Sequence, residues 1–241
     1  MPKFFFQKND ISRGQVQLFG EDEKHIKTVL RAREGEEITL CDGEGMDYQC
    51  RIASLERGVL LDILSQEVCE TEPKTKITLY QGLPKADKME LIIQKCVELG
   101  VDRIVAVSTE RAIVKLDKKE AKKLERWQKI AEAAAKQSGR GKIPEIGQQV
   151  LKFKEAVAEA KELDGAIIPY EREQETGIRQ FVQNFKGESV GVFIGPEGGF
   201  ADEEIALAQE NGITPITLGK RILRTETAGM TTTAILLYEL D

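Results

Sequence analysis

The sequence has few residues that bind metals or form disulfides: one histidine and four cysteines in 241 residues. This argues against a metalloprotein and against a disulfide-stabilised protein. The cysteines stand at positions 41, 50, 69 and 96, and no two of them form a Cys-x-x-Cys pair. Structural zinc sites use closely spaced cysteine and histidine ligands, so we expect no metal. Cys41 and Cys50 can face each other across a hairpin, but reduced packing cysteines are the expectation for a cytoplasmic chain.

Long apolar runs are missing as well. None approaches the about 20 residues that a membrane-spanning helix needs. The first six residues lack the apolar stretch and the small-residue cleavage site of a signal peptide. Hydrophobic residues make up 41% of the chain and charged residues 32%, as in ordinary globular proteins, and the length allows one large domain or two modest ones. We therefore predict a cytoplasmic protein with no membrane contact.

An overall positive charge is absent too, since the net charge is -6. The charges are unevenly distributed, however: residues 1–72 carry 9 basic and 15 acidic side chains, residues 73–143 carry 17 and 9, and residues 144–241 carry 9 and 17. The positive middle third can attract nucleic acid while the rest of the chain stays acidic. A solvated helix of mixed charge over residues 117–126 explains part of that excess equally well.

The first 72 residues read as short β-strands separated by turns. Residues 38–41 and 48–52 are strand-like and flank Asp42-Gly43-Glu44-Gly45, which is a strong hairpin signal. Residues 59–64 form a further strand. The pattern predicts a small β-barrel or sandwich. It ends at residues 70–74, where the net charge changes sign, so we place a domain boundary after residue 72.

From residue 73 on, predicted strands and helices alternate. This alternation predicts a parallel sheet covered by helices, and it assigns the chain to the α/β class with domains at residues 1–72 and 73–241. The expected strands cover residues 77–80, 103–107, 166–169, 190–194 and 215–218. The expected helices cover residues 88–99, 120–137 and the end of the chain from about residue 225.

Two strings have the composition of ligand-binding loops. Gly195-Pro196-Glu197-Gly198-Gly199-Phe200 follows one expected strand, and residues 218–228 follow the last one and open a helix. Glycines at such turns let the backbone approach a ligand, and ligands bind at the carboxyl ends of strands in open α/β sheets. Neither string matches the dinucleotide or phosphate-loop pattern. The alternatives are a structural turn for the first string and a plain helix N-cap for Thr225 in the second.

A third string, Gln137-Ser138-Gly139-Arg140, ends the long central helix. Gly139 by itself indicates a helix C-cap. Arg140 can instead reach a phosphate or a base of RNA.

The strings at residues 195–200 and 218–228, in this order and at this separation, resemble the RsmE family of ribosomal RNA methyltransferases in the SPOUT superfamily. The resemblance covers nearly the whole chain, with further matches at residues 25–31, 85–90, 98–101, 110–111 and 137–140. The chain departs from the family pattern at Lys3, Ala201 and Tyr170, where the family often has arginine, serine or threonine, and tryptophan.

What the resemblance implies is a PUA-like β-barrel at the N-terminus, followed by an α/β domain with a parallel sheet and a deep trefoil knot. It further implies a homodimer that binds S-adenosylmethionine and methylates N3 of one uridine in 16S ribosomal RNA of the small subunit. The residues at matching positions around the methyl donor are Gly195, Glu197, Gly198, Leu218, Gly219, Ile222 and Leu223. Arg224 and Glu226 match charged active-site positions, while Arg31, Arg33, Gln137 and Arg140 are expected to contact RNA.

The chemistry that this family performs fits the inventory of side chains. Alkylation of N3 requires loss of its proton, so the site needs a positive group to favour the uracil anion and, in some mechanisms, a base. We expect Arg224 or Arg140 in the first role and Glu226 in the second, or as an orienting group. The alternatives are methylation of another RNA or of a ribose hydroxyl, and a non-catalytic RNA-binding module that retains the donor fold.

Overall fold

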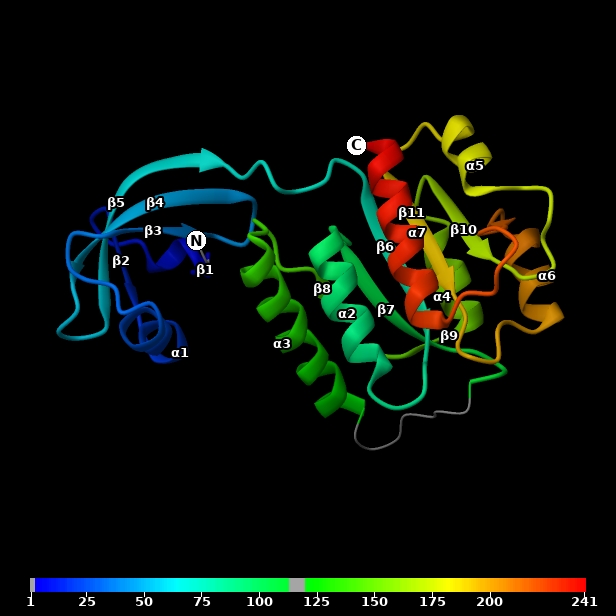
Figure 1. The fold of residues 1–241 in the computed structure, drawn as a ribbon, viewed down its shortest axis with the longest axis horizontal. Helices are drawn as coiled ribbons and strands as arrows, with labels where there is room; N and C mark the ends of the chain where they lie inside the picture. The colour runs from blue at the N-terminus through cyan, green and yellow to red at the C-terminus, as the bar shows by residue number, and fades with distance from the viewer. Residues whose placement is uncertain (1–2, 113–119) are drawn as a thin grey trace. The chain divides into compact units, whose positions relative to one another are not determined.

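The computed structural model describes residues 3–112 and 120–241 (Figure 1). The chain forms two compact units: Met1–Glu72 with Ala135–Ile143, and Pro73–Ala134 with Pro144–Asp241. The domain boundary predicted after residue 72 stays a proposal. The first unit also contains a segment from later in the chain, residues 135–143. Within the described ranges, no helix is both long enough and apolar enough to span a bilayer.

The first unit is built around a five-stranded sheet in the order β1-β3-β4-β5-β2. Its strands are β1 (Phe4–Phe5), β2 (Gln15–Leu18), β3 (Glu37–Cys41), β4 (Met46–Ser54) and β5 (Val59–Val68), and the short turns of helix are η1 (Lys8–Asp10), α1 (Gly20–Lys24) and η2 (His25–Val29). Alternate residues of the strands, such as Leu40 and Leu61, point into one apolar core. The predicted hairpin joins β3 to β4, because Asp42 accepts backbone hydrogen bonds from Glu44 and Met46 at 2.8 and 3.1 Å.

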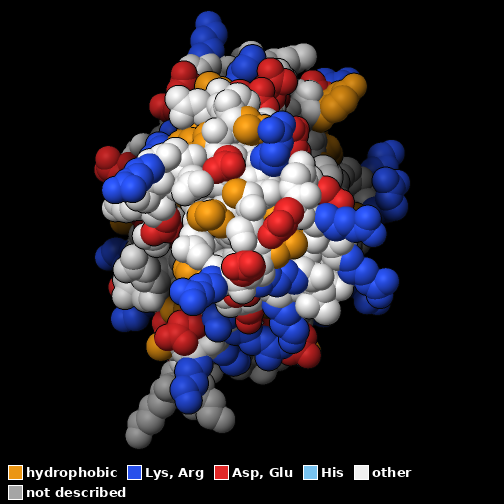
Figure 2. All heavy atoms as spheres, turned by 90° about the vertical axis from the view of Figure 1, so that its left-hand side faces the viewer, with side chains coloured by type: hydrophobic (Ala, Val, Ile, Leu, Met, Phe, Trp, Pro, Cys, Tyr) orange, Lys and Arg blue, Asp and Glu red, His pale blue; other side chains and the backbone are white. Residues whose placement is uncertain are grey.

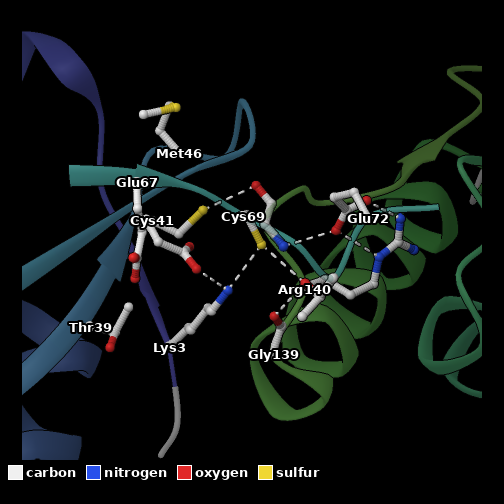
Figure 3. A network of polar contacts seen from close by, with 12 residues as sticks. Lys3, Thr39, Cys41, Met46, Glu67, Cys69, Glu72, Gly139 and Arg140 are labelled. Carbon is white, nitrogen blue, oxygen red and sulfur yellow. Dashed lines mark hydrogen bonds and ion pairs between the residues drawn. The ribbon is translucent and has the colours of Figure 1, made fainter. Parts of the chain in front are cut away.

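Residues 135–143 complete this first unit, as Figure 3 shows. Gly139 ends the preceding helix with a φ of 72°, which confirms the C-cap interpretation. The turn delivers Arg140 to Glu72, with Nη2 and Oε2 2.7 Å apart and side chains only 4% and 13% exposed. The hydroxyl of Thr71 donates to the Gly139 carbonyl at 2.9 Å. This segment is therefore held by a buried ion pair and by backbone hydrogen bonds.

Three more side chains extend the same network (Figure 3). Lys3 Nζ lies 2.5 Å from Asp47 Oδ2 and 3.1 Å from Cys69 Sγ. Its side chain is 11% exposed, so the substitution of lysine for the family's arginine falls at an internal ion pair. All four cysteines are free and buried, and burial raises the pKa of the Cys41 thiol to about 12.

We expect Arg140→Met to lower the free energy of unfolding by about 3 kcal/mol, because it leaves a largely buried carboxylate without its counter-charge. The matched control is Arg51→Met, which removes an ion pair to Glu37 whose side chains are 51% and 55% exposed. An exposed pair contributes less than about 1 kcal/mol. Urea unfolding followed by circular dichroism measures both variants. Equal shifts of the unfolding midpoint would show that the Arg140 pair contributes no more than a surface contact.

The second unit contains a sheet in the order β12-β10-β11-β6-β7-β8, with β9 also pairing with β7. All of its pairings are parallel, which confirms the predicted sheet. The strands are β6 (Lys76–Gly82), β7 (Arg103–Ser108), β8 (Glu145–Ile146), β9 (Leu151–Lys152), β10 (Gly165–Pro169), β11 (Ser189–Ile194) and β12 (Thr214–Ile216).

Helices cover both faces of this sheet (Figure 1). The helices after β6 are α2 (Lys88–Leu99), α3 (Glu120–Ser138), α4 (Phe153–Ala160), α5 (Ile178–Asn184), α6 (Asp202–Glu210) and α7 (Thr225–Leu240). Helices α4 and α6 share a core with Tyr80 and Phe193, whose rings stack with centroids 4.5 Å apart. Helices α2 and α7 pack on each other. Because both faces are covered, the central strands are apolar on both sides.

The strand order brings together chain ends that are far apart in sequence. The chain begins the sheet at the central strand β6, runs to one side through β7, and later fills the other side with β10, β11 and β12. After the edge strand β12, α7 returns to pack on β6 and β11. The segments that follow β6, β10, β11 and β12 therefore leave the same edge of the sheet. The trefoil knot implied by the resemblance stays a prediction.

Candidate functional site

One pocket of about 990 Å³ lies at the carboxyl edge of the parallel sheet. Its walls are the segments that follow β10, β11 and β12, together with Lys88 at the start of α2. This is the edge at which open α/β sheets bind ligands, and the volume suits a nucleoside-sized molecule. Seven residues predicted to surround a methyl donor line this pocket: Gly195, Glu197, Gly198, Leu218, Gly219, Ile222 and Leu223.

The loop after β11 is a tight turn that has little room for side chains. Gly199 N donates to the Pro196 carbonyl at 2.9 Å, and Gly199 has a φ of 67°. A Cβ atom on Gly195 would lie 3.2 Å from the Gly199 backbone, and one on Gly198 would lie 3.1 Å from Arg111 Cβ. The backbone therefore forms this wall of the pocket, and larger residues would disturb it.

Glu204 holds the same loop from behind. This buried carboxylate accepts hydrogen bonds from the backbone N–H groups of Ala201 and Glu110, both at 2.9 Å. The Ala201 bond is the half of a capping box that the glutamate makes, and alanine lacks the hydroxyl that would make the other half. Arg111 Nη1 donates to the Gly198 carbonyl at 3.3 Å. The loop after β7 is thus hydrogen-bonded to the loop after β11, residues 195–200, which is called the glycine loop below.

Thr225 joins the loop after β12 to the one after β11. Its hydroxyl donates to the Gly195 carbonyl at 2.6 Å and accepts from Gln81 Nε2 at 2.9 Å. Arg224 is the N-cap of α7, so the interpretation of Thr225 as a plain N-cap is wrong. Gln81 is fully buried at the end of β6. These two bonds connect the ends of β6 and β11 to the start of α7.

A second close approach occurs between β6 and the glycine loop. A Cβ atom on Gly82 would lie 2.7 Å from Pro196 Cδ and 2.8 Å from Pro196 N. Sequence reasoning missed Gly82 and Gln81, because a glycine or glutamine at a strand end carries no signal of its own. Their importance follows only from the pairing of β6 with β11.

Lys88 and Glu197 line the pocket, and Lys88 also contacts Glu226, a predicted active-site residue that lies beside the pocket and does not line it. Lys88 Nζ lies 2.9 Å from Glu197 Oε1 and 3.4 Å from Glu226 Oε2. The hydrogen bond to Glu197 holds the pKa of Lys88 above its ordinary value. Burial tends to raise the pKa of the Glu197 carboxyl, but hydrogen bonds from Lys88 and from backbone N–H groups outweigh it and lower this pKa. Both groups are therefore charged at neutral pH.

Arg224 lines the pocket with an exposed side chain that makes no hydrogen bond or ion pair within residues 3–112 and 120–241. Arg140 lies instead in the first unit, 3% exposed and paired with Glu72. Of the two arginines predicted to face a uracil, only Arg224 is at the pocket. The RNA contact predicted for Arg140 stays a prediction, and the structure shows this side chain buried in an ion pair.

The other predicted RNA-contacting residues, Arg31, Arg33 and Gln137, are exposed on the first unit. Arg31 has a φ of 53°, in the turn that follows η2. Figure 2 shows a face of the molecule on which Lys and Arg side chains are interspersed with Asp and Glu. No cluster of three metal-ligating side chains occurs in the part of the chain that the structure describes.

Comparison with known proteins identifies relatives over most of both units. A model described as an RNA methyltransferase domain matches residues 71–237, and one described as an RNA methyltransferase PUA domain matches residues 20–64. The chain is 35% identical to ribosomal RNA small subunit methyltransferase E of Bacillus subtilis over 93% of this chain and 90% of that protein. It is 32% identical to the protein of the same name from Aquifex aeolicus, over 93% and 95%.

Solved structures agree with these matches. Ribosomal RNA small subunit methyltransferase E of Neisseria gonorrhoeae, solved with bound S-adenosylmethionine, superposes with a TM-score of 0.88 at 35% identity and covers 99% of this chain and 97% of that one. A methyltransferase from Legionella pneumophila, also with bound cofactor, gives a TM-score of 0.85 at 36% identity, over 98% and 96%.

Proposed function

The chain belongs to the ribosomal RNA small subunit methyltransferase E family, and on this basis we propose that it transfers a methyl group from S-adenosylmethionine to N3 of a uridine in 16S ribosomal RNA. One observation carries the proposal: all seven residues predicted to hold the donor line a single pocket at the carboxyl edge of the sheet. The cysteines, buried and free, take no part in this chemistry.

The residues of the pocket fit the proposed cofactor. The glycine turn at residues 195–199 offers backbone atoms at the pocket wall, where a Cβ atom would already crowd the chain. Leu218 and Leu223 supply apolar surface for an adenine ring, while Glu197 supplies a charged group. Ile222 lines the pocket although it is 89% exposed, so a bound ligand would cover apolar surface there. When bound, S-adenosylmethionine supplies an electrophilic methyl group.

Two charged side chains, Arg224 in the pocket wall and Glu226 beside the pocket, account for the remaining requirements of the reaction. Arg224 is the positive group that favours the uracil anion after N3 loses its proton, and this role is stronger where water is excluded. Glu226, two residues later, orients the site or accepts that proton. Arg140 is left out of this mechanism because it is buried against Glu72 in the other unit.

The partners proposed for this chain are the small ribosomal subunit, in which the 16S RNA lies, and a second copy of the chain. Exposed apolar side chains on α2 and α7 support the homodimer, since such surface is often covered in an assembly. These side chains are Leu91, Leu99 and Tyr238, with exposed fractions of 43%, 39% and 87%. A cytoplasmic location is part of the same proposal.

Arg31 and Arg33 are proposed to contact the RNA backbone from the first unit. Replacing both by glutamine is expected to weaken binding of 16S RNA about tenfold at 150 mM salt and to reduce the slope of log K against log salt by one to two, because fewer counterions are released. Filter binding across a salt series measures both quantities. The matched control replaces Arg13 and Arg57, also exposed on this unit, by glutamine. An equal loss in the control would show a general charge effect without a specific contact.

The experiment that tests the proposed function is transfer of labelled methyl from S-adenosylmethionine to small subunits that lack the modification, followed by nucleoside analysis. N3-methyluridine is the expected product. A ribose-methylated nucleoside, or labelling of transfer RNA alone, would replace the proposal by another reaction of the superfamily. Absence of label in every RNA offered would favour a binding module without catalysis.

A further inference from the structure

Lys88 occupies the point where three loops of the pocket meet. It is the first residue of α2, after the loop that follows β6. Its ammonium group reaches Glu197 in the loop after β11, at 2.9 Å, and Glu226 in the first turn of α7, at 3.4 Å. The Lys88 side chain is 31% exposed and also lines the pocket. A single cation thus links segments that are more than 100 residues apart.

This position is an unfavourable one for a lysine. The N-terminus of a helix carries a partial positive charge, so a cation in the first turn lowers helix stability by a few tenths of a kcal/mol or more. Asp87, the N-cap of α2, makes no side-chain capping bond, and Glu90 in the first turn pairs with Arg126 at 2.8 Å. The carboxylates of Glu197 and Glu226 supply the compensating negative charge. Helix formation alone therefore does not explain a lysine at this position.

The two carboxylates depend on Lys88 to different degrees. Glu197 also accepts hydrogen bonds from the backbone N–H of Lys85, at 3.1 and 3.3 Å. Glu226 Oε2 is buried and has no hydrogen-bond partner among the described residues, so its contact to the ammonium of Lys88 is the interaction that compensates its burial. A buried carboxylate oxygen that loses its only compensating charge carries a large desolvation penalty, which a shift toward solvent would relieve. Removal of Lys88 should therefore displace Glu226 more than Glu197.

We propose that Lys88 is a positioning residue for methyl transfer: it lines the pocket and holds the carboxylate of Glu226, which lies directly behind it. The inference rests on the proposed function, in which Glu226 orients the site or accepts the N3 proton. Lys88 then affects the rate of methyl transfer. Binding of the methyl donor depends instead on the glycine loop and on Glu197, which keeps its hydrogen bonds from the Lys85 N–H when Lys88 is replaced.

The test compares Lys88→Met with Lys95→Met. Lys95 lies on the same helix, is 41% exposed, and pairs with Glu98 at 2.9 Å, so the control removes the same charge and one ion pair away from the pocket. Calorimetry with S-adenosylmethionine alone measures donor affinity. Turnover on small subunits lacking the modification measures kcat. We expect Lys88→Met to lower kcat at least about 30-fold and to change donor affinity less than about threefold. Lys95→Met should change neither.

Two further variants separate positioning from a general structural effect. Lys88→Arg keeps the charge and should retain kcat within about fivefold of the wild type. In a Glu226→Gln background, Lys88→Met should cost less than about threefold, because two residues that act as a unit are not additive. Thermal unfolding checks that each protein is folded. Should Lys88→Met unfold at the assay temperature, Lys88→Gln carries the same expectation.

The outcomes distinguish the inference from the function on which it rests. Wild-type turnover retained by Lys88→Met, a loss confined to donor affinity, or an equally large loss in the Glu226→Gln background would each overturn the role of Lys88 and leave the proposed function standing. Failure of the wild-type protein to methylate any RNA, despite binding the donor, would overturn both.

Discussion

Arg224→Ala is expected to lower kcat about 100- to 1,000-fold while changing the affinity for S-adenosylmethionine less than about threefold. Removing one group that stabilises developing negative charge in an active site typically has this effect on kcat. The side chain is available for that role, because it is exposed at the pocket and makes no hydrogen bond or ion pair within the described residues. Arg140, the other arginine predicted for it, is 3% exposed in the first unit.

Single-turnover methylation of small subunits, with the donor saturating, measures this loss, and calorimetry measures donor affinity. Arg179→Ala is the matched control, since Arg179 is an exposed arginine of α5 that does not line the pocket. Arg224→Lys should recover only part of the rate, because a lysine cannot reproduce the planar set of guanidinium donors. Normal turnover in Arg224→Ala would remove Arg224 from the mechanism. A loss of donor affinity equal to the loss of rate would make it a binding residue.

Gly82→Ala is expected to weaken donor binding at least about 30-fold, although one methyl group is added to a residue that does not itself line the pocket. The added Cβ would lie 2.7 Å from Pro196 Cδ and 2.8 Å from Pro196 N. Backbone atoms cannot rotate away as a flexible side chain can, so the loop after β11 must move. Gly195 and Gly198, which belong to that loop, would then be displaced from the donor.

Gly147→Ala is the matched control, because its added Cβ would make ordinary contacts of 3.6 Å with Val105. Calorimetry measures the affinity directly, and the rise in melting temperature caused by the donor gives a second measure, since ligand binding stabilises a fold in proportion to RT ln(1 + [L]/Kd). Gly82→Ala should show little rise and Gly147→Ala a normal one. Unchanged donor affinity in Gly82→Ala would mean that the loop can move without consequence for the site.

Local patterns in the sequence determined the class of fold and the place of the pocket. Strand and helix patterns alternate from residue 73 on, and this alternation leads to a parallel sheet because short connections leave no other arrangement for such elements. The glycine string at residues 195–199 and the string at residues 218–224 each follow a strand. Since all strands of a parallel sheet end at one edge, both strings were expected at that edge, and the strand order then placed them around one pocket. These are short-range features, and they can be read without knowing the neighbours.

Only the tertiary structure decided which distant residues support those loops. Gln81 and Thr225 are 144 positions apart, and Glu110 and Glu204 are 94 apart, yet each pair is joined by a hydrogen bond. Gly82 meets Pro196 because β6 lies beside β11, a neighbour relation that depends on the order of strands in the sheet. The sequence around a glycine or glutamine at a strand end does not show which distant residues it will contact, so its role cannot be predicted from that sequence.

The same reason explains Arg140 and Lys88. A sequence shows that a residue is charged, but whether the charge faces solvent, a ligand or a counter-ion depends on what the fold places against it. The chain turns at Gly139 and brings Arg140 to Glu72, where burial makes the pair part of the first unit. The start of α2 places Lys88 between Glu197 and Glu226 at the pocket. Composition thus determined which charges are present, and long-range packing decided that Arg140 is buried against Glu72 while Lys88 lines the pocket.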